Sequence, residues 1–129
     1  MVGVVIVSHS AKIAEGAKEL AAQMCPDFEG IFAAGGMEDG SIGTDAVRIK
    51  DAIESADSGD GVVILADLGS GILSAETAID LLESDIDARI ADAPIVEGAV
   101  IAAVQASIGC SFDEVVKEAE LTGQQSKLH

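Results

Sequence analysis

The sequence has no tryptophan or tyrosine, and basic side chains are scarce. Its 129 residues include 7 lysines and arginines against 23 aspartates and glutamates, for a formal net charge of −16. Proteins that bind DNA or RNA use basic stripes to contact phosphates and aromatic rings to stack on bases. The composition therefore argues against a nucleic-acid partner.

Cysteine and histidine are also rare, with 2 residues of each. Cys25 and Cys110 lie far apart without a Cys-x-x-Cys spacing, so a Cys/His metal site has too few ligands. We expect two reduced thiols, no metal and no bound cofactor.

Long hydrophobic runs are missing as well. Residues 1–8 have neither the basic lead nor the cleavage site of a secretion signal. The mildly apolar stretch 98–110 contains Gln105 and is shorter than the ~20 residues that a membrane span needs. We therefore expect a soluble, cytoplasmic protein without a membrane span.

The chain does have enough apolar residues for a core, since 49% of it is hydrophobic. A chain of this length fits one domain. The carboxylates are spread along the whole sequence rather than gathered in one tail. This spread favours a solvated acidic coat, as a salt-rich cytoplasm would require, over a docking patch for a basic partner.

Strand-type and helix-type patterns alternate along the chain without a linker or repeat. We expect strands at 2–7, 28–34, 61–66 and 88–91. We expect helices at 11–24, from a Thr44 cap to about 56, after Gly71, at 96–108, and from a Ser111 capping box to about 121. This alternation predicts an α/β fold with one doubly wound, mainly parallel sheet and helices on both faces. The strand order expected for this sheet is 2-1-3-4, although the alternation itself does not fix the order. The domain is assigned to 1–121, and the tail 122–129 is expected to be flexible.

Two helices have apolar faces that predict how they pack. On the helix at 11–24, one face is expected to point into the core. Its members are Ile13, Ala17, Leu20, Ala21 and Met24. The segment 96–108 is apolar nearly all round and is expected to be buried.

The order 2-1-3-4 brings His9 and Asp67 together. In such sheets, ligands bind beyond the carboxyl ends of the strands, where the strand order reverses. His9 follows the first strand and precedes a helix, whose free N–H groups favour an anion. A histidine there could hold a covalently attached phosphoryl group if one ring nitrogen is unprotonated and the other donates to an acceptor. Asp67 is the candidate acceptor.

Donors for the phosphoryl oxygens must come mainly from the backbone, because the chain has only two arginines, Arg48 and Arg89. The candidates are Ser10, Gly35, Gly36, Gly69, Ser70 and Gly71. Each also has a plain structural interpretation: a loop histidine is often only solvated, and Gly-Ser-Gly is a common turn. The glycines after the second strand could simply build a long loop.

Other phosphate-handling motifs are missing from the sequence. It contains no GxGxxG, no GxxxxGK[ST] and no GxSxG. A phosphoaspartate receiver would need acidic residues after the first strand to hold Mg²⁺, and this chain has Ser8, His9 and Ser10 there.

Four segments carry a resemblance to a known family. They are VIVSHS at 5–10, GGMEDGSIGTD at 35–45, DLGSG at 67–71 and APIVEGA at 93–99. Together they resemble the phosphotransferase subunit of the phosphoenolpyruvate-dependent dihydroxyacetone kinase, which is similar to the IIA domain of the mannose-family sugar phosphotransferase system. The resemblance extends to about residue 121. The stretch 71–74 departs from the family pattern, which leaves open which residues contact the nucleotide-bearing partner.

The resemblance implies a compact, usually dimeric α/β domain that works as a phosphotransferase without a cofactor. It takes a phosphoryl group from the phosphocarrier HPr and passes it to ADP on the kinase's nucleotide subunit, while another subunit binds dihydroxyacetone. His9 matches the phosphorylated histidine, and Asp67 matches the carboxylate that orients it. Gly36, Thr44 and Ser70 match loops around the site.

Two other functions stay open. One is a sugar-transport IIA domain, which shares the fold and the histidine. The other is a regulatory or small-ligand-binding α/β module, in which His9 is only a polar contact.

Overall fold

Four parallel strands form the centre of the computed structural model, which describes residues 1–128. They are β1 (Gly3–Ser8), β2 (Ile31–Gly35), β3 (Val62–Ala66) and β4 (Ala88–Ile90). The strand order is β2-β1-β3-β4, and all neighbours are parallel. The predicted α/β fold and strand order are confirmed.

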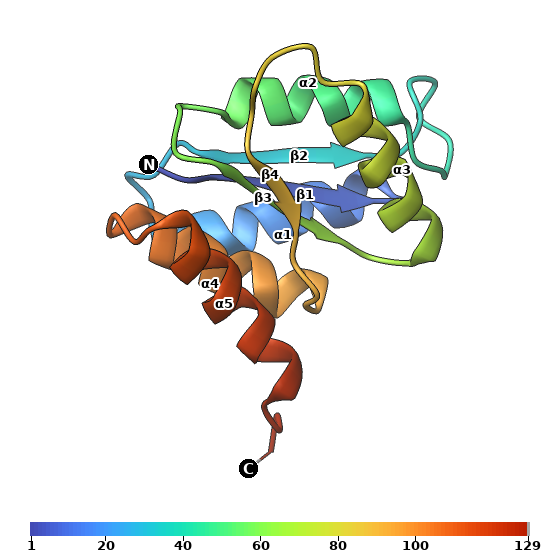
Figure 1. Ribbon diagram of the computed structural model, residues 1–129. Coiled ribbons are helices and arrows are strands. Elements are labelled where there is room, and N and C mark those ends of the chain that lie inside the picture. The colour runs from blue at the N-terminus through green and yellow to red at the C-terminus, as the bar shows by residue number, and fades with distance from the viewer. Residues whose placement is uncertain (129) are drawn as a thin grey trace.

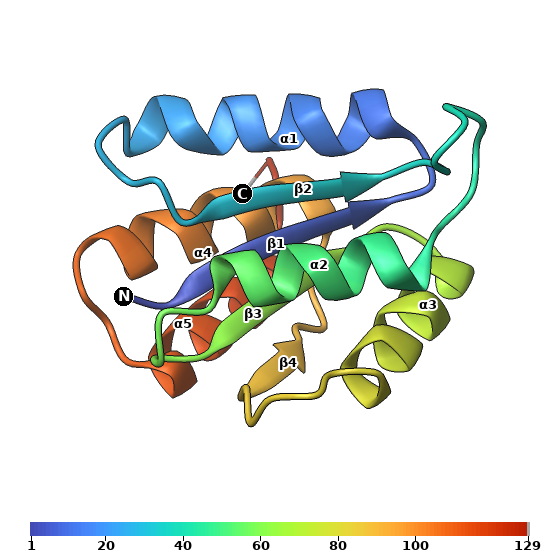
Figure 2. The same ribbon diagram turned by 90° about the horizontal axis from the view of Figure 1, so that it is seen from above.

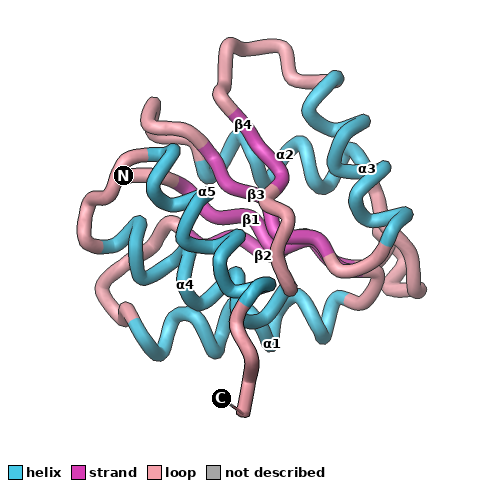
Figure 3. Tube along the Cα trace, turned by 60° about the horizontal axis from the view of Figure 1, so that its bottom comes forward, coloured by secondary structure: helices cyan, strands magenta, loops and turns pink. Residues whose placement is uncertain are grey.

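Helices cover both faces of this sheet. They are α1 (Ala11–Met24), α2 (Ala46–Ala56), α3 (Gly69–Asp80), α4 (Ile95–Ser107) and α5 (Phe112–Leu121), and a short 3₁₀ turn η1 (Thr122–Gln124) follows α5. Figure 1 shows α2 and α3 on one face, and α1, α4 and α5 on the other. In Figure 3 the magenta strands lie enclosed between the cyan helices. The doubly wound arrangement thus buries both sides of the central strands.

The alternation of side chains along β1 divides the core into two layers. Val4 and Ile6 point to the layer with α1, α4 and α5, whereas Val5 and Val7 point to the layer with α2 and α3. All residues of β1 and β3 are buried. This explains why both strands are continuous apolar runs rather than alternating ones.

The predicted inward face of α1 is wrong at three of its five positions. Ile13, Leu20 and Met24 are 51%, 44% and 60% exposed. The buried positions are Ala14, Ala17 and Ala21. The helix lies too close to the sheet for larger side chains, because a Cβ at Gly35 of β2 would be only 2.8 Å from the Cβ of Ala14. Small residues therefore face the sheet, and the large apolar ones face outward.

The helix α4 is buried on one side only. Gly98, Ala99 and Ala102 are among its buried residues, whereas Val96 is 38% exposed and Ile108, just after the helix, is 69% exposed. The expectation that the whole segment 96–108 is buried therefore holds only for the face toward the sheet and the neighbouring helices.

Several predicted boundaries change. β2 begins at Ile31 rather than at 28. α2 is capped by Asp45, whose carboxylate accepts from the N–H groups of Val47 and Arg48, and not by Thr44. α3 begins at Gly69, so the Gly-Ser-Gly stretch is its first turn rather than a loop.

The carboxyl-terminal part follows the predicted capping box. Ser111 accepts from the N–H of Glu114, whose carboxylate accepts from the N–H of Ser111, and α5 ends at Leu121. Of the tail, η1 forms a short turn, and Nζ of Lys127 lies 3.0 Å from Oε2 of Glu97. The flexibility of the tail stays a prediction, and its last residue, His129, lies outside the described residues.

Candidate functional site

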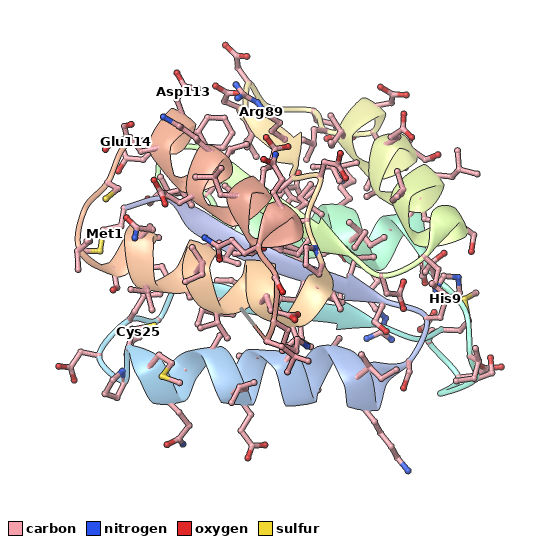
Figure 4. The ribbon with its side chains drawn as sticks, turned by 90° about the horizontal axis from the view of Figure 1, so that it is seen from below. Met1, His9, Cys25, Arg89, Asp113 and Glu114 are labelled. Carbon is pink, nitrogen blue, oxygen red and sulfur yellow. The ribbon has the colours of Figure 1, made fainter. Side chains whose placement is uncertain are left out.

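The carboxyl ends of the strands carry the candidate site. Figure 2 shows that the start of α1, the segment between β2 and α2, and the start of α3 lie at the end toward which the β1 and β2 arrows point. In Figure 4, His9 lies at the opposite end of the molecule from Met1 and Cys25. The topology therefore gathers segments that are distant in sequence around one histidine.

His9 occupies the short connection between β1 and α1. Ser10 is the N-cap of α1, and its side chain accepts from the N–H of Ile13 at 3.3 Å. The side chain of His9 is 22% exposed. A ring in this place is anchored by its neighbours yet can still be reached from outside.

Asp67 follows β3 and holds both the ring and the backbone of His9. Its Oδ1 lies 2.9 Å from Nδ1 of His9, and its Oδ2 accepts from the backbone N–H of His9 at 3.0 Å. Oδ2 also accepts from the hydroxyl of Ser8 at 2.8 Å, and Oδ1 accepts from the N–H of Leu68 at 2.7 Å. The predicted pairing of His9 with Asp67 is present in the structure.

These contacts keep the carboxylate charged. Burial raises the pKa of Asp67, but hydrogen bonds from the N–H of His9, the Ser8 hydroxyl, the N–H of Leu68 and the His9 ring outweigh it, so the pKa lies below its ordinary value. An ionised carboxylate accepts only, so the proton of a neutral ring lies on Nδ1. The lone pair is then on Nε2, the nitrogen that a phosphoryl group could occupy.

Ser70 lies against that second nitrogen. Its Oγ is in hydrogen-bond contact with Nε2 of His9. Because Nε2 carries the lone pair in this tautomer, the Ser70 hydroxyl donates. Ser70 belongs to the exposed first turn of α3, so one helix start supplies a donor at the reactive position.

The two glycines beside Ser70 differ in what their surroundings allow. A Cβ at Gly71 would lie 2.9 Å from Oδ1 of Asp67 and 3.7 Å from Cε1 of His9, whereas a Cβ at Gly69 would have no neighbour within 4 Å. The lack of a side chain at Gly71 therefore leaves room for the His9–Asp67 pair. At Gly69 the surrounding space is open, so the pair does not depend on a glycine there.

The segment between β2 and α2 is tied to the backbone of the same histidine. The N–H of Gly36 donates to the carbonyl of Ser8 at 3.1 Å, and the N–H of Gly43 donates to the carbonyl of His9 at 2.8 Å. Gly36 has a φ of +72°, in the left-handed region that favours glycine. The N–H of Gly36 is therefore already used within the turn. A Cβ at Gly35 would lie 2.6 Å from the carbonyl oxygen of Ser10, so Gly35 lets β2 approach the start of α1 closely, and its role as a phosphate donor stays a prediction.

Comparison with known proteins shows the family of this chain. The model of the EIIA-man family, described as "PTS system fructose IIA component", matches residues 3–116. The chain belongs to the EIIA-man family. In this EIIA-man chain, the match runs from β1 into the first half of α5 and includes both His9 and Asp67.

Curated relatives of the EIIA-man chain share one kind of name. The "PEP-dependent dihydroxyacetone kinase 2, phosphoryl donor subunit DhaM" of Listeria innocua is 42% identical over 120 residues, which cover 92% of this chain and 96% of that protein. The "PEP-dependent dihydroxyacetone kinase, phosphoryl donor subunit DhaM" of Escherichia coli is 47% identical over 124 residues, which cover 92% of this chain and 26% of that protein. A relative with the same name in Providencia stuartii is 43% identical over all of this chain, which spans 28% of that protein.

Solved structures have the same fold. A crystal structure of a protein of unknown function is 40% identical, has a TM-score of 0.83, and covers 97% of each chain. The phosphotransferase system component EIIA from Streptococcus agalactiae has a TM-score of 0.70 at 13% identity, with coverage of 96% of this chain and 93% of that chain, and supports the fold alone.

Two residues of this EIIA-man site have roles that the sequence did not indicate. Ser8 is fully buried and links Asp67 to the turn, because its Oγ also accepts from the N–H of Ser10 at 3.1 Å. The only signal was a hydroxyl at the end of an apolar run. Thr44 was expected both as a helix cap and in a loop around the site. It does not cap α2, and its Oγ1 lies 2.6 Å from Oγ of Ser74 in α3, a contact that the sequence did not indicate.

Within residues 1–128, the EIIA-man chain has no group of three or more His, Cys, Asp or Glu side chains arranged to hold a metal ion. No helix of that range has the length and apolar character to cross a membrane. One hollow of about 670 Å³ is lined by residues such as Met1, Cys25 and Phe28, at the end of the sheet opposite His9. Another, of about 600 Å³, is lined by Asp67, Ile72 and Arg89 among others.

Proposed function

We propose that the chain is a phosphohistidine carrier that accepts a phosphoryl group on Nε2 of His9. The observation that carries this proposal is the contact of Nδ1 with Asp67, because it directs the proton to one ring nitrogen and the lone pair to the other. The names of the relatives, which are phosphoryl donor subunits, support the same chemistry.

The transfer step needs only the ring and its carboxylate. The lone pair of Nε2 attacks phosphorus, the bond between phosphorus and the donor's nitrogen breaks, and the donor nitrogen keeps that electron pair. Nδ1 of His9 retains its proton, so the phosphorylated ring carries a positive charge that the Asp67 carboxylate faces at 2.9 Å. This electrostatic support lowers the energy of the charged ring and of the transition state that leads to it.

Donors for the phosphoryl oxygens come from the start of α3 in this proposal. The Ser70 hydroxyl lies at Nε2, and the first N–H groups of a helix lack intrahelical acceptors. The positive end of the helix dipole points the same way. Gly71 N–H already donates to the carbonyl of Leu68 at 2.9 Å, which leaves Gly69 and Ser70 as the backbone donors that we assign.

The donor and the acceptor are proposed from the family resemblance, and the relatives' names support only a dihydroxyacetone kinase system. We assign HPr as the donor, and ADP on the nucleotide subunit of a dihydroxyacetone kinase as the acceptor. A separate subunit would bind dihydroxyacetone. A carrier between these partners acts as a phosphotransferase and works in the cytoplasm. The Listeria innocua relative, of which this chain covers 96%, carries the name of such a subunit.

Incubation with phosphoenolpyruvate, enzyme I and HPr tests this function. The wild-type chain should gain about 80 Da as an acid-labile, base-stable phosphate, and His9→Ala should gain nothing. A label on another residue, or no label on a folded chain, would overturn the proposal and favour a small-ligand-binding module.

A sugar-transport IIA domain would pass the same labelling test. The acceptor distinguishes the two functions: the phosphorylated chain should lose its label to the ADP-loaded kinase subunit and keep it in the presence of a sugar-permease component. Retention with the kinase subunit and loss to the permease component would assign the chain to sugar transport.

We also propose that the carrier is a homodimer that pairs through α1. Ile13, Leu20 and Met24 form a stripe of large apolar side chains on the outer face of that helix. Leu20→Asp should convert the dimer to a monomer of 13.0 kDa in sedimentation analysis, and Gln23→Asp on the same helix should not. A wild-type chain that sediments as a monomer would exclude the dimer.

A further inference from the structure

Ser70 must be held in place from outside its own helix. The N-cap position of α3, Leu68, makes no side-chain hydrogen bond to the helix. The first turn then contains two glycines, whose backbone freedom disfavours helix. A serine on such a turn would not by itself keep its hydroxyl at a fixed distance from the His9 ring.

Thr44 provides a contact from the neighbouring segment. Its Oγ1 lies 2.6 Å from Oγ of Ser74, one turn beyond Ser70 in α3, and 3.5 Å from the carbonyl oxygen of Ser70, at the outer limit of a hydrogen bond. When the Thr44 hydroxyl donates to that carbonyl, the Ser74 hydroxyl donates to Thr44. The two hydroxyls thus connect the segment before α2 to the first turns of α3.

The segment that carries Thr44 is attached to His9 itself. The residue before it, Gly43, donates its N–H to the carbonyl of His9 at 2.8 Å. A closed path of contacts therefore runs from the His9 backbone through Gly43 and Thr44 to α3, and returns from Ser70 to the ring nitrogen. Because the path is closed, the position of Thr44 determines where Ser70 lies relative to Nε2.

We propose that Thr44 and Ser74 form a hydroxyl clasp that positions Ser70 at Nε2 of His9. In the unphosphorylated chain, the clasp keeps the Ser70 hydroxyl on the lone pair of Nε2. During transfer the Ser70 hydroxyl must leave that lone pair and turn to the phosphoryl oxygens, and the clasp keeps Ser70 beside the ring while it does so; this second role rests on the proposed function. Thr44 and Ser74 are positioning residues, because neither contacts the ring.

Nitrogen NMR of the His9 ring tests the clasp without any phosphoryl transfer. Thr44→Val replaces the hydroxyl by a methyl group of the same shape, and the Nε2 resonance should move toward that of an imidazole nitrogen without a donor. Thr44→Ser keeps the hydroxyl and should retain the wild-type spectrum. Thr77→Val is the matched control, because Thr77 in the same helix donates only to the carbonyl of Leu73, at 3.0 Å.

The transfer assay supplies a second measurement. Thr44→Val should lower the rate of phosphoryl uptake by about fivefold, the value of one hydrogen bond, without changing KM for the donor protein. Ser74→Ala should act alike, and the double variant should be little worse than either single one, because both changes remove the same link.

A wild-type Nε2 resonance in both Thr44→Val and Ser74→Ala would overturn the clasp. The two proposals fail separately: a His9 that never takes up phosphate overturns the carrier function, whereas the ring spectrum still decides the clasp. If circular dichroism shows that one of the variants does not fold, the other variant gives the decisive spectrum.

Discussion

The carboxylate of Asp67 accepts four hydrogen bonds within the site. It accepts from the ring and backbone of His9, from Ser8 and from Leu68. Each contact either fixes the carboxylate or uses its charge. At the scale of single residues, the proposed function therefore depends on one anion behind the ring.

Replacing that anion by a neutral amide should slow transfer without unfolding the chain. Asp67→Asn keeps the size of the side chain but removes the charge that faces Nδ1, so we expect a loss in transfer rate of about tenfold or more. The rate of phosphoryl uptake from HPr measures it. Asp39→Asn is the control, because Asp39 is exposed and accepts from Ser41 instead of the ring. Equal rates for wild type and Asp67→Asn would remove Asp67 from the mechanism.

The same carboxylate should make stability depend on pH. Its pKa in the folded chain lies below the ordinary value of 3.8. The stability it contributes is therefore present above pH 3.8 and is lost as the pH falls through the folded value. Urea unfolding should show a steeper loss of stability on acidification below pH 3.8 for the wild type than for Asp67→Asn. If the free energy of unfolding falls equally with pH in the wild type and in Asp67→Asn, the lowered pKa of Asp67 is contradicted.

Two glycines of one helical turn offer a matched pair of variants. Gly71→Ala places a Cβ 2.9 Å from Oδ1 of Asp67, so we expect a destabilisation of about 1–3 kcal/mol and slower labelling of His9. Gly69→Ala meets no atom within 4 Å and should be neutral or stabilising by up to about 1 kcal/mol. Urea unfolding measures both, and equal effects would show that the space beside Asp67 does not matter.

At the scale of elements, α5 depends on its amino-terminal capping box. The Ser111 hydroxyl accepts from the N–H of Glu114, and the Glu114 carboxylate accepts from both the N–H and the hydroxyl of Ser111. Ser111→Ala should lower the free energy of unfolding by about 1 kcal/mol. Ser55→Ala, at an exposed position inside α2, should have no comparable cost. A Ser111→Ala chain as stable as the wild type in urea would contradict this role of the cap.

The element scale also shows how far sequence reasoning reached. The close approach of His9 and Asp67 followed from strand periodicity once the strand order 2-1-3-4 was assumed, because parallel strands end at one edge of a sheet. Periodicity did not supply that order. The Ser111 capping box was predicted, but the cap of α2 was not: Thr44 and Asp45 are both good N-cap residues, and the choice depends on the contact of Thr44 with Ser74 in another helix. The orientation of α1 was likewise not predictable, because alanines and larger apolar residues form two adjacent stripes and only the distance to Gly35 distinguishes them.

At the scale of the whole molecule, the charge of −16 should make stability depend on salt. The described ion pairs include few lysines and arginines, so most carboxylates repel one another through solvent. Added salt screens this repulsion. We expect the melting temperature to rise between low and molar KCl, as followed by circular dichroism. A melting temperature that stays constant or falls would exclude the acidic coat as an adaptation to salt.

The separation of His9 from Asp67 has a consequence for how the chain matures. The two residues are 58 positions apart and meet only where β1 and β3 lie side by side. An emerging polypeptide that has made its first strand but not its third holds an imidazole without a counter-charge. Phosphoryl uptake would therefore begin only after these strands have paired. The fraction of phosphorylated His9 during refolding would then measure how much of the chain has paired β1 with β3.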